Sequence, residues 1–542
     1  MNNPYMMDMG TFLIVLISPF VLYFLWKYKT YHIEGKIQKN GLLYSWEKNK
    51  LASGPNPPLK NFISGHFWTN IEDFKRKSKE NLKKNPVYMS NFSFWKDFAR
   101  DCELPTYLKK SCEKEKFYAD ANNICRSMLV VGGAGGGKTV FLLNLCSQNW
   151  YSKGVFYSKK GEDYEPFFYR GKTIDILVNP KLEMASIHNV LDEPTQYIEV
   201  FVQTLVNGAL GEEVEFFSST AKTELEEFLQ DVFIKAMDDG LSIKEKWSML
   251  LSTFETEYAK AMGESKGSKK DVFATLKLIM KPFYLSAYRI IETDAETFTA
   301  KDFLNSPHPQ NLFLNAADPS VEGILAATYT VLVKTQLAMP NYWCKKPVLH
   351  LQDEYNSLSR MVGEDILNEL REVGRSKMSA PVGGVQGLTH DKTKAQQLLT
   401  NMQYLVAFAG SDPSTLETIC GLVGNVKYIH HKESTSYNNQ GKSVTISEDK
   451  VDEPVITPYH LNILQEEGFS SIFIGLKEKI LFKGYTPQAK LEPRGIDFLK
   501  QIDMNGFTRW TKAKRDNMKS KDKQTLAAIN DIYDDINFNN FN

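Results

Sequence analysis

The sequence is poor in cysteine, has no net charge and lacks common metal motifs, and each shortage excludes a class of protein. Six cysteines in 542 residues include no C-x-x-C pair, which argues against a disulfide scaffold and for reduced thiols. Lys plus Arg and Asp plus Glu both number 65, so a uniformly basic nucleic-acid coat protein is excluded, although a local basic channel is not. No H-E-x-x-H motif is present, and apolar residues at 42% with charged residues at 24% are typical of globular domains rather than of disordered chains.

Long apolar runs are also scarce, and the exception lies near the N-terminus. The segment from Met9 to Trp26 contains no charged residue, and about 18 residues at a rise of about 1.5 Å span roughly 27 Å, close to the hydrocarbon thickness of a bilayer. Lys27, Lys29 and Lys36 follow it, whereas only Asp8 precedes it. The positive-inside rule then predicts an uncleaved, single-pass anchor with the bulk of the chain in the cytoplasm.

Strand-like and helix-like stretches alternate through most of the chain, which predicts an α/β domain with a parallel sheet. One region differs, because apolar residues such as Leu225, Val232 and Ala236 recur there at helical spacing and predict an all-α domain inserted into the α/β domain. The end of the chain is polar and is expected to form a solvated helix followed by disorder. The expected segments are a transmembrane anchor (1–30), a juxtamembrane or linker region (31–115), the first part of the α/β domain (116–215), the inserted all-α domain (216–295), the second part of the α/β domain (296–500) and a polar C-terminal tail (501–542).

A glycine-rich phosphate-binding motif follows a predicted strand and opens a predicted helix. The pattern G-x-x-x-x-G-K-[ST] is matched in full by Gly132, Gly133, Ala134, Gly135, Gly136, Gly137, Lys138 and Thr139. Glycines let backbone N–H groups turn inward around an anion, and the helix N-terminus adds its positive end. Lys138 then reaches the β- and γ-phosphates of ATP, and the Thr139 hydroxyl ligates Mg²⁺. The motif predicts a P-loop NTPase domain; by itself it does not distinguish kinases, switches and motors.

Two adjacent carboxylates, Asp353 and Glu354, end another predicted strand. The carboxyl end of a parallel strand lies beside the phosphate loop, so Asp353 is expected to hold the Mg²⁺ shell and Glu354 to orient and deprotonate the attacking water. His350 and Gln352 stand in this strand where apolar residues are expected. Asp318 is the alternative acid, but it has no second carboxylate beside it.

These motifs together resemble the type IV secretion coupling proteins, within the HerA/FtsK-like ring ATPases. The similarity runs from about Phe117 to Pro487, some two thirds of the chain. The pieces that carry it, in family order, are the loop GGAGGGKT, Lys160-Gly161-Glu162, Asn179-Pro180, Phe216-Phe217-Ser218-Ser219-Thr220-Ala221-Lys222, Asp353-Glu354-Tyr355-Asn356-Ser357-Leu358, Gly374-Arg375, Val382-Gly383-Gly384-Val385-Gln386 and Glu453-Pro454-Val455-Ile456-Thr457-Pro458.

The resemblance implies a RecA-like P-loop domain in a hexameric ATPase that is anchored in the bacterial inner membrane. Such an ATPase hands DNA, a relaxase–DNA complex or protein effectors to the components of a type IV secretion channel. The resemblance implies further that Arg375 acts as an arginine finger in the neighbouring subunit's site, and that Gln386 senses the γ-phosphate. Two other functions stay open: a DNA translocase of the same superfamily unconnected to secretion, and a nucleotide-dependent receptor scaffold with little hydrolysis. The zero net charge leaves DNA and protein cargo both open.

Overall fold

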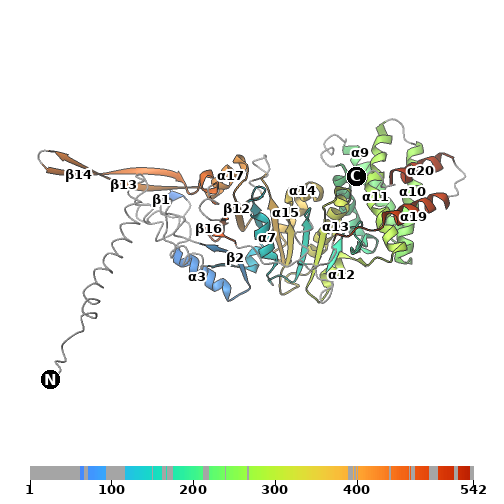
Figure 1. The fold of residues 1–542 in the computed structure, drawn as a ribbon, viewed down its shortest axis with the longest axis horizontal. Helices are drawn as coiled ribbons and strands as arrows, with labels where there is room; N and C mark the ends of the chain where they lie inside the picture. The colour runs from blue at the N-terminus through green and yellow to red at the C-terminus, as the bar shows by residue number, and fades with distance from the viewer. Residues whose placement is uncertain are drawn as a thin grey trace, which may run out of the picture.

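A mixed β-sheet forms the centre of the part of the chain that the structure describes (Figure 1). The computed structural model describes residues 62–65, 71–92, 116–148, 150–160, 175–210, 219–238, 240–264, 268–388, 401–438, 441–462, 470–486, 499–517 and 523–536, with single positions between them. Within these residues the sheet has eleven strands, in the spatial order β3 (Lys116–Asp120), β2 (Pro86–Phe92), β16 (Ile480–Tyr485), β15 (Ser471–Gly475), β12 (Tyr404–Phe408), β4 (Met128–Val131), β11 (Ser379–Val385), β10 (Val348–Gln352), β5 (Lys153–Ser158), β9 (Gln310–Asn315) and β6 (Ile176–Val178). From β12 to β6 neighbouring strands run parallel, while β15, β16, β2 and β3 join antiparallel. The predicted α/β fold with a parallel-rich sheet, as in P-loop NTPases, is confirmed.

The parallel strands are buried on both faces, which explains why they read as continuous apolar runs. In β4, Leu129 and Val131 belong to one core cluster, and Met128 and Val130 belong to the other. The second cluster includes the buried side chains of α7 (Lys138–Cys146). The first includes those of α8 (Ile198–Leu210), α13 (Pro319–Ala338), α14 (Tyr355–Val362), α15 (Glu364–Glu372) and α17 (Pro413–Val423). The strand ends therefore emerge between two helical layers.

Shorter elements complete the described α/β part. They are α3 (Ile71–Leu82), α6 (Ala121–Ile124), α12 (Ala300–Asn305), α18 (Pro458–Asn462), the 3-10 turns η3 (Val190–Asp192) and η4 (Thr195–Tyr197), and the two-stranded parallel pair β7 (Ile187–His188) and β8 (Thr297–Phe298). Helix starts follow capping rules here: the Thr299 hydroxyl accepts a hydrogen bond from Asp302 N at the start of α12.

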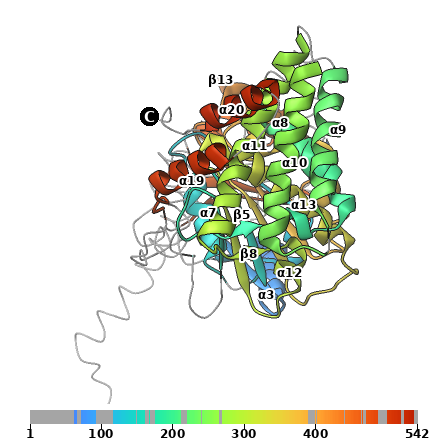
Figure 2. The same cartoon turned by 90° about the vertical axis from the view of Figure 1, so that its right-hand side faces the viewer.

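Three long helices lie between β6 and β9 in the chain and stand beside one another at one end of the molecule (Figure 2). They are α9 (Ser219–Ala236), α10 (Ile243–Glu264) and α11 (Ser268–Glu292). Leu225, Val232 and Ala236 of the predicted apolar stripe are fully buried. The Arg289 side chain of α11, itself buried, donates hydrogen bonds to the carbonyls of Pro180, Leu182, Glu183 and Ala185. This arginine therefore fixes the helices to the segment that follows β6.

The C-terminal segment does not behave as the sequence predicted. It forms α19 (Met504–Asn517) and α20 (Lys523–Ile536), which pack against α10 and α11 (Figure 2). Tyr284 of α11 and Tyr533 of α20 donate hydrogen bonds to Glu255 Oε1 of α10, at 2.9 and 2.6 Å, and burial raises the pKa of this carboxyl group. The expectation of a solvated helix followed by disorder is wrong for these two helices, because a polar average composition concealed the few apolar residues, such as Phe507, that they bury.

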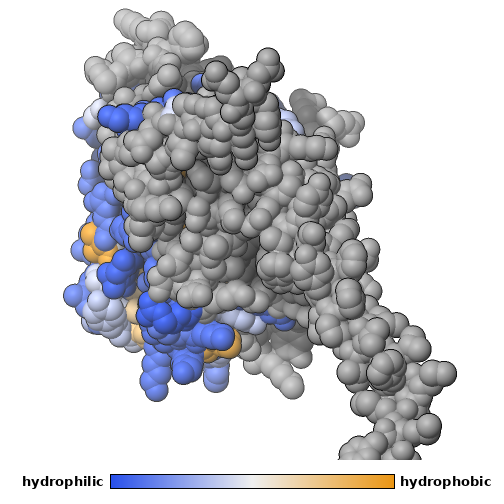
Figure 3. All heavy atoms as spheres, turned by 90° about the vertical axis from the view of Figure 1, so that its left-hand side faces the viewer, coloured by the Kyte–Doolittle hydropathy of each residue, from blue (hydrophilic) through white to orange (hydrophobic). Residues whose placement is uncertain are grey.

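A long hairpin extends from the opposite end of the molecule (Figure 1). It consists of β13 (Asn425–Asn438) and β14 (Gly441–Pro454), and β13 also pairs with β1 (Phe62–Gly65). Seen from this end, the coloured atoms are mostly hydrophilic (Figure 3). No helix among the described residues is long and apolar enough to cross a membrane, and the predicted anchor from Met9 to Trp26 lies outside those residues.

Candidate functional site

The phosphate loop connects the end of β4 to the start of α7, as predicted, and its backbone needs glycine at two positions for conformational reasons. Gly135 has φ of 76° and Gly137 has φ of 103°, a region that side chains with a Cβ disfavour. Ala134, which precedes them, is exposed. Gly137 is also the N-cap of α7, so the unpaired N–H groups of the first helical turn open directly onto the loop.

Other glycines of the loop are required by a close approach of the chain that follows β12. A Cβ added to Gly133 would lie 2.0 Å from the carbonyl oxygen of Gly410, and one added to Gly136 would lie 2.7 Å from that of Ala409. At Gly132 the nearest atom would be Phe408 Cβ, at 2.6 Å. The loop is therefore held against the end of the neighbouring strand, and larger residues would displace it.

Lys138 and Thr139 begin α7, immediately after the glycines. Lys138 is 8% exposed and Thr139 is half-buried. A lysine ammonium group and a hydroxyl group at a helix N-terminus fit a phosphate chain and its bound cation. The geometry is that of an anion-binding site.

Asp353 lies at the end of β10 with its side chain turned toward β11 and α7. The residue is 3% exposed, and its backbone N–H donates to Tyr157 O at 3.0 Å. A Cβ on Gly384 of β11 would lie 3.2 Å from Asp353 Oδ1 and 3.4 Å from Leu142 of α7, so the glycine leaves room for the carboxylate. Burial and, after it, the charge of Asp353 raise the pKa of the Cys146 thiol in the same helix α7.

Glu354 follows directly and is the N-cap residue of α14. It is half-buried. The pKa of the Tyr157 hydroxyl on β5 is raised by burial first, then by Glu322, and then by the charge of Glu354. A carboxylate at this position has the placement expected of a group that accepts a proton from water.

Gln386 follows the end of β11, the strand that lies between β4 and β10. It is exposed, and the preceding residue, Val385, accepts a hydrogen bond from Gly132 N at 3.1 Å. The sheet thus brings the phosphate loop, Gln386 and the Asp353–Glu354 pair to one edge.

Arg375 is not brought to this edge. It is exposed in the turn that precedes β11, which runs parallel to β4, and seven residues of strand at about 3.3 Å each separate it from the C-terminal edge by roughly 23 Å. Two backbone hydrogen bonds close the turn: Gly374 O accepts from Ser379 N at 2.8 Å and from Lys377 N at 2.9 Å. Arg375 therefore cannot contact the phosphate loop of its own subunit.

The alternative acid, Asp318, has a structural role. Its side chain accepts from Ser320 N as the N-cap of α13 and pairs with Lys181 at 2.5 Å. Burial raises the pKa of Asp318, but the hydrogen bonds from Lys181 and Ser320 outweigh it, so that the net pKa is lowered. It follows β9, which β5 separates from β10.

The polar residues of β10 that depart from the expected apolar pattern have partners on α13. His350 Nε2 contacts Gln336 Oε1 at 2.5 Å, and the Gln352 amide donates to Tyr329 Oη at 2.6 Å. Both strand residues are buried. The helix therefore compensates the polarity of the strand, a correlation between segments that the strand sequence alone does not reveal.

Replacing His350 with Leu is expected to reduce the loss of stability at low pH. Burial lowers the pKa of His350 to about 3 from an ordinary value of 6.5, so below about pH 6.5 the unfolded chain binds a proton that the folded chain does not. The residue has no such effect above that pH, and it removes about 1.4 kcal/mol of unfolding free energy per pH unit below it. Urea unfolding between about pH 7 and about pH 4.5 measures the difference. His350→Gln should behave alike, and equal pH dependence in all three proteins would contradict this assignment.

The residues at the edge fit Mg²⁺ in the manner usual for nucleotide sites. No group of three His, Cys, Asp or Glu side chains in the described part of the chain could hold a metal ion by itself. Mg²⁺ is commonly held by one or two protein oxygens together with phosphate oxygens and water. Thr139 and Asp353 are the groups that would supply the protein oxygens.

Comparisons with known proteins show the family of this chain. The family model described as the type IV secretion-system coupling protein DNA-binding domain matches residues 120–478. No curated protein sequence matches the chain. Among solved structures, the bacterial conjugative coupling protein TrwB in an unbound form has 17% identity and a TM-score of 0.55 over 83% of this chain and 98% of that chain.

Two further TrwB structures, titled as complexes with ADP and Mg²⁺ and with the ATP analogue ADPNP, have 17% and 16% identity, each with a TM-score of 0.55 over 82% of this chain and 99% of that chain. At these identities the structural likeness shows a shared fold. The family match spans well over half of the 542 residues. The chain therefore belongs to the type IV secretion-system coupling proteins and carries their DNA-binding domain.

Proposed function

We propose that this coupling protein binds ATP with Mg²⁺ and uses its hydrolysis to drive cargo into a type IV secretion or conjugation channel. The observation that carries the proposal is the strand order β4, β11, β10, which gathers the phosphate loop, Gln386 and the Asp353–Glu354 pair at one edge. The titles of TrwB structures name ADP with Mg²⁺ and an ATP analogue as ligands of that protein, which supports the same ligands here.

Each residue then has a defined task. The loop N–H groups and Lys138 bind the phosphates, while Thr139 and Asp353 hold Mg²⁺, which supplies charge neutralisation on the phosphate oxygens. The Glu354 carboxylate accepts a proton from the water that attacks the γ-phosphorus. The bond between the γ-phosphorus and the β–γ bridging oxygen breaks, and ADP leaves with the electron pair of that bond. Gln386, beside the loop, contacts the γ-phosphate.

The assembly is a ring, and the position of Arg375 supports it. Since Arg375 lies at the edge opposite its own phosphate loop, it can contact a nucleotide only in another subunit. Head-to-tail packing of identical chains around a closed ring provides that arrangement, and we take the ring to be a hexamer. The finger would neutralise charge that develops on the transferred phosphoryl group.

The proposed membrane anchor and the helices α9–α11 define which face of the proposed ring is turned to the membrane and which to the cargo. We propose that residues 1–30 anchor the chain in the inner membrane with its bulk in the cytoplasm, and that 216–295 form an inserted all-α domain facing the cargo. The apolar, charge-free run and the lysines after it support the topology. Protease added outside spheroplasts should spare everything after Lys36, and digestion of the ATPase region there would refute it.

The cargo is proposed to include DNA, alone or bound to a relaxase, because the matching family model is described as a DNA-binding domain. ATPase rates of the purified full chain, with and without single-stranded and double-stranded DNA, test this. Stimulation by DNA is expected. Hydrolysis that DNA leaves unchanged would favour protein effectors as cargo, stimulation by DNA without any transfer defect in a deletion strain would favour a translocase unconnected to secretion, and binding without hydrolysis would favour a receptor scaffold.

A further inference from the structure

The carboxylate of Glu322, a residue outside the predicted site, contacts three donor groups. Glu322 is the one acidic residue in the sequence of α13. Its Oε1 lies 3.1 Å from the donating Tyr157 hydroxyl, 2.6 Å from the donating Ser357 hydroxyl and 2.8 Å from Lys159 Nζ. The Glu322 side chain is only 13% exposed, so these contacts are largely shielded from water.

Two of the three donors, Tyr157 and Ser357, lie on β5 and α14, which hydrogen-bond to the backbone of the acidic pair. Tyr157 is the second-last residue of β5, and its carbonyl oxygen accepts from Asp353 N at 3.0 Å. Ser357 lies in the first turn of α14, where its N–H donates to Glu354 O, also at 3.0 Å. Glu322 therefore joins, through side chains, the strand and the helix turn that fix the backbone of Asp353 and Glu354.

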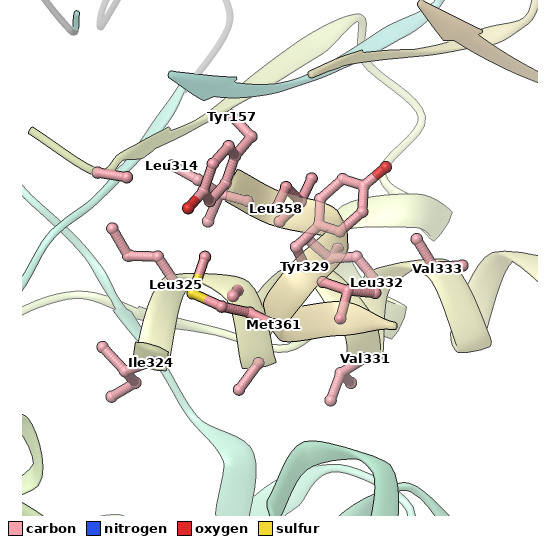
Figure 4. Close-up of a cluster of buried hydrophobic side chains, with 14 of the residues drawn as sticks. Tyr157, Leu314, Ile324, Leu325, Tyr329, Val331, Leu332, Val333, Leu358 and Met361 are labelled. Atoms are coloured by element: carbon pink, nitrogen blue, oxygen red, sulfur yellow. The ribbon is translucent and has the colours of Figure 1, made fainter. Parts of the chain in front are cut away.

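The Tyr157 ring, whose hydroxyl donates to Glu322, belongs to an apolar cluster. Tyr157 lies among Leu325, Leu358 and Met361 of α13 and α14 (Figure 4). A buried carboxylate is tolerated only where hydrogen bonds and an opposite charge compensate its lost hydration. An apolar residue at this place would take the acceptor away from the Tyr157 and Ser357 hydroxyls and from Lys159, so the carboxylate links segments that lie next to the site.

We propose that Glu322 is a positioning residue that fixes the orientation of Glu354 through Tyr157 and Ser357. The inference rests on the proposed function, because it concerns the hydrolysis step assigned to Glu354. It predicts that a change at Glu322 affects turnover and leaves nucleotide binding nearly intact, since no contact of Glu322 involves the phosphate loop.

The test is Glu322→Gln in the purified full chain, assayed with DNA present. The amide can still accept a hydrogen bond from one hydroxyl, but it loses the charged contact to Lys159. A hydrogen bond to a charged group changes the equilibrium between the bonded and the open arrangement by about a factor of 10 or more. We expect kcat to fall about 10-fold or more while the Kd for ATP changes less than about threefold. Tyr157→Phe and Ser357→Ala, which each remove one donor, should give smaller losses in the same direction, and they replace Glu322→Gln if that variant does not fold.

A matched control uses the same helix. Glu369 of α15 pairs with Lys334 of α13 at 2.7 Å, and Lys334 is 12 residues from Glu322, about 18 Å along the helix. Glu369→Gln removes a comparable ion pair from α13 without touching the site, and it should hydrolyse ATP as the wild-type chain does.

A double-mutant cycle separates positioning from general destabilisation. If Glu322 acts through Glu354, Glu322→Gln should lower single-turnover hydrolysis little further in a Glu354→Gln background. An unchanged kcat in Glu322→Gln, the same fold-loss in both backgrounds, or an equal loss in Glu369→Gln would each overturn the proposal. If the wild-type chain binds ATP but does not hydrolyse it, the proposed function fails first; hydrolysis by wild type and variant alike defeats the positioning role alone.

Discussion

Glu354→Gln is expected to bind ATP as the wild-type chain does and to hydrolyse it about 10²-fold or more slowly. The residue follows the buried Asp353 at the edge where the phosphate loop lies, and a glutamine there preserves shape but cannot accept a proton from water. Titration with a fluorescent ATP analogue measures binding, and phosphate release in a single turnover measures hydrolysis. Lys138→Ala should differ, because loss of the ammonium group beside the phosphates weakens binding and turnover together.

The control for this pair is Asp318→Asn. Asp318 is also an acid at the carboxyl end of a parallel strand, but it caps α13 and pairs with Lys181, and asparagine retains the capping ability. Its hydrolysis should stay close to that of the wild-type chain. Near-normal turnover in Glu354→Gln together with a large loss in Asp318→Asn would transfer the role of the base to Asp318.

Arg375→Ala is expected to bind ATP normally and to lose about 10³- to 10⁵-fold in turnover if the ring forms as proposed, since an arginine supplied in trans contributes on that scale. The dependence on a neighbour also predicts that the specific activity of the wild-type chain rises with protein concentration. Mixing supplies the sharper measurement. Arg375→Ala has an intact phosphate loop, and Lys138→Ala can still donate Arg375, so the two inactive proteins together should recover partial activity at hybrid interfaces.

Lys345→Ala is the matched control for this experiment. Lys345 is an exposed cation in the loop before β10, at the same edge of the parallel strands as Arg375, so its loss tests whether positive charge there suffices. Its activity should be close to that of the wild-type chain. A rate independent of concentration, with a fully active Arg375→Ala, would leave Arg375 as a surface residue without a role in a neighbouring site.

The parts of the site that could be predicted are those written in contiguous residues. The run Gly132 to Thr139 is recognisable from the sequence alone. Its glycines stand where φ is positive or where other atoms lie too close for a Cβ. Asp353 was recognisable because it ends a buried strand. A parallel sheet could be predicted from the alternation of strands and helices, but the order of its strands could not, and the placements of Gln386 and Arg375 were expected only from a resemblance to a family.

The parts that could not be predicted depend on contacts between distant segments. Glu322 lies 165 residues from Tyr157 and 35 from Ser357, and the signal in the sequence is limited to a single acid in a helix that has no other. The pairing of His350 with Gln336 is hidden in the same way. The roles assigned to site residues and the boundaries of the segments remain predictions, and the anchor lies outside the described residues.

The packing of α19 and α20 on the long helices has a consequence for synthesis of the protein. Tyr284 leaves the ribosome 249 residues before Tyr533, its neighbour across Glu255, and at about 5 to 20 residues per second that interval is roughly 12 to 50 seconds. During this time the nascent α10 and α11 expose the face that the C-terminal helices later cover. Chains stalled near residue 500 should thus be cleaved by protease within α10 and α11 faster than chains that include α19 and α20. The packing of α19 and α20 is then the last step in the folding of this region.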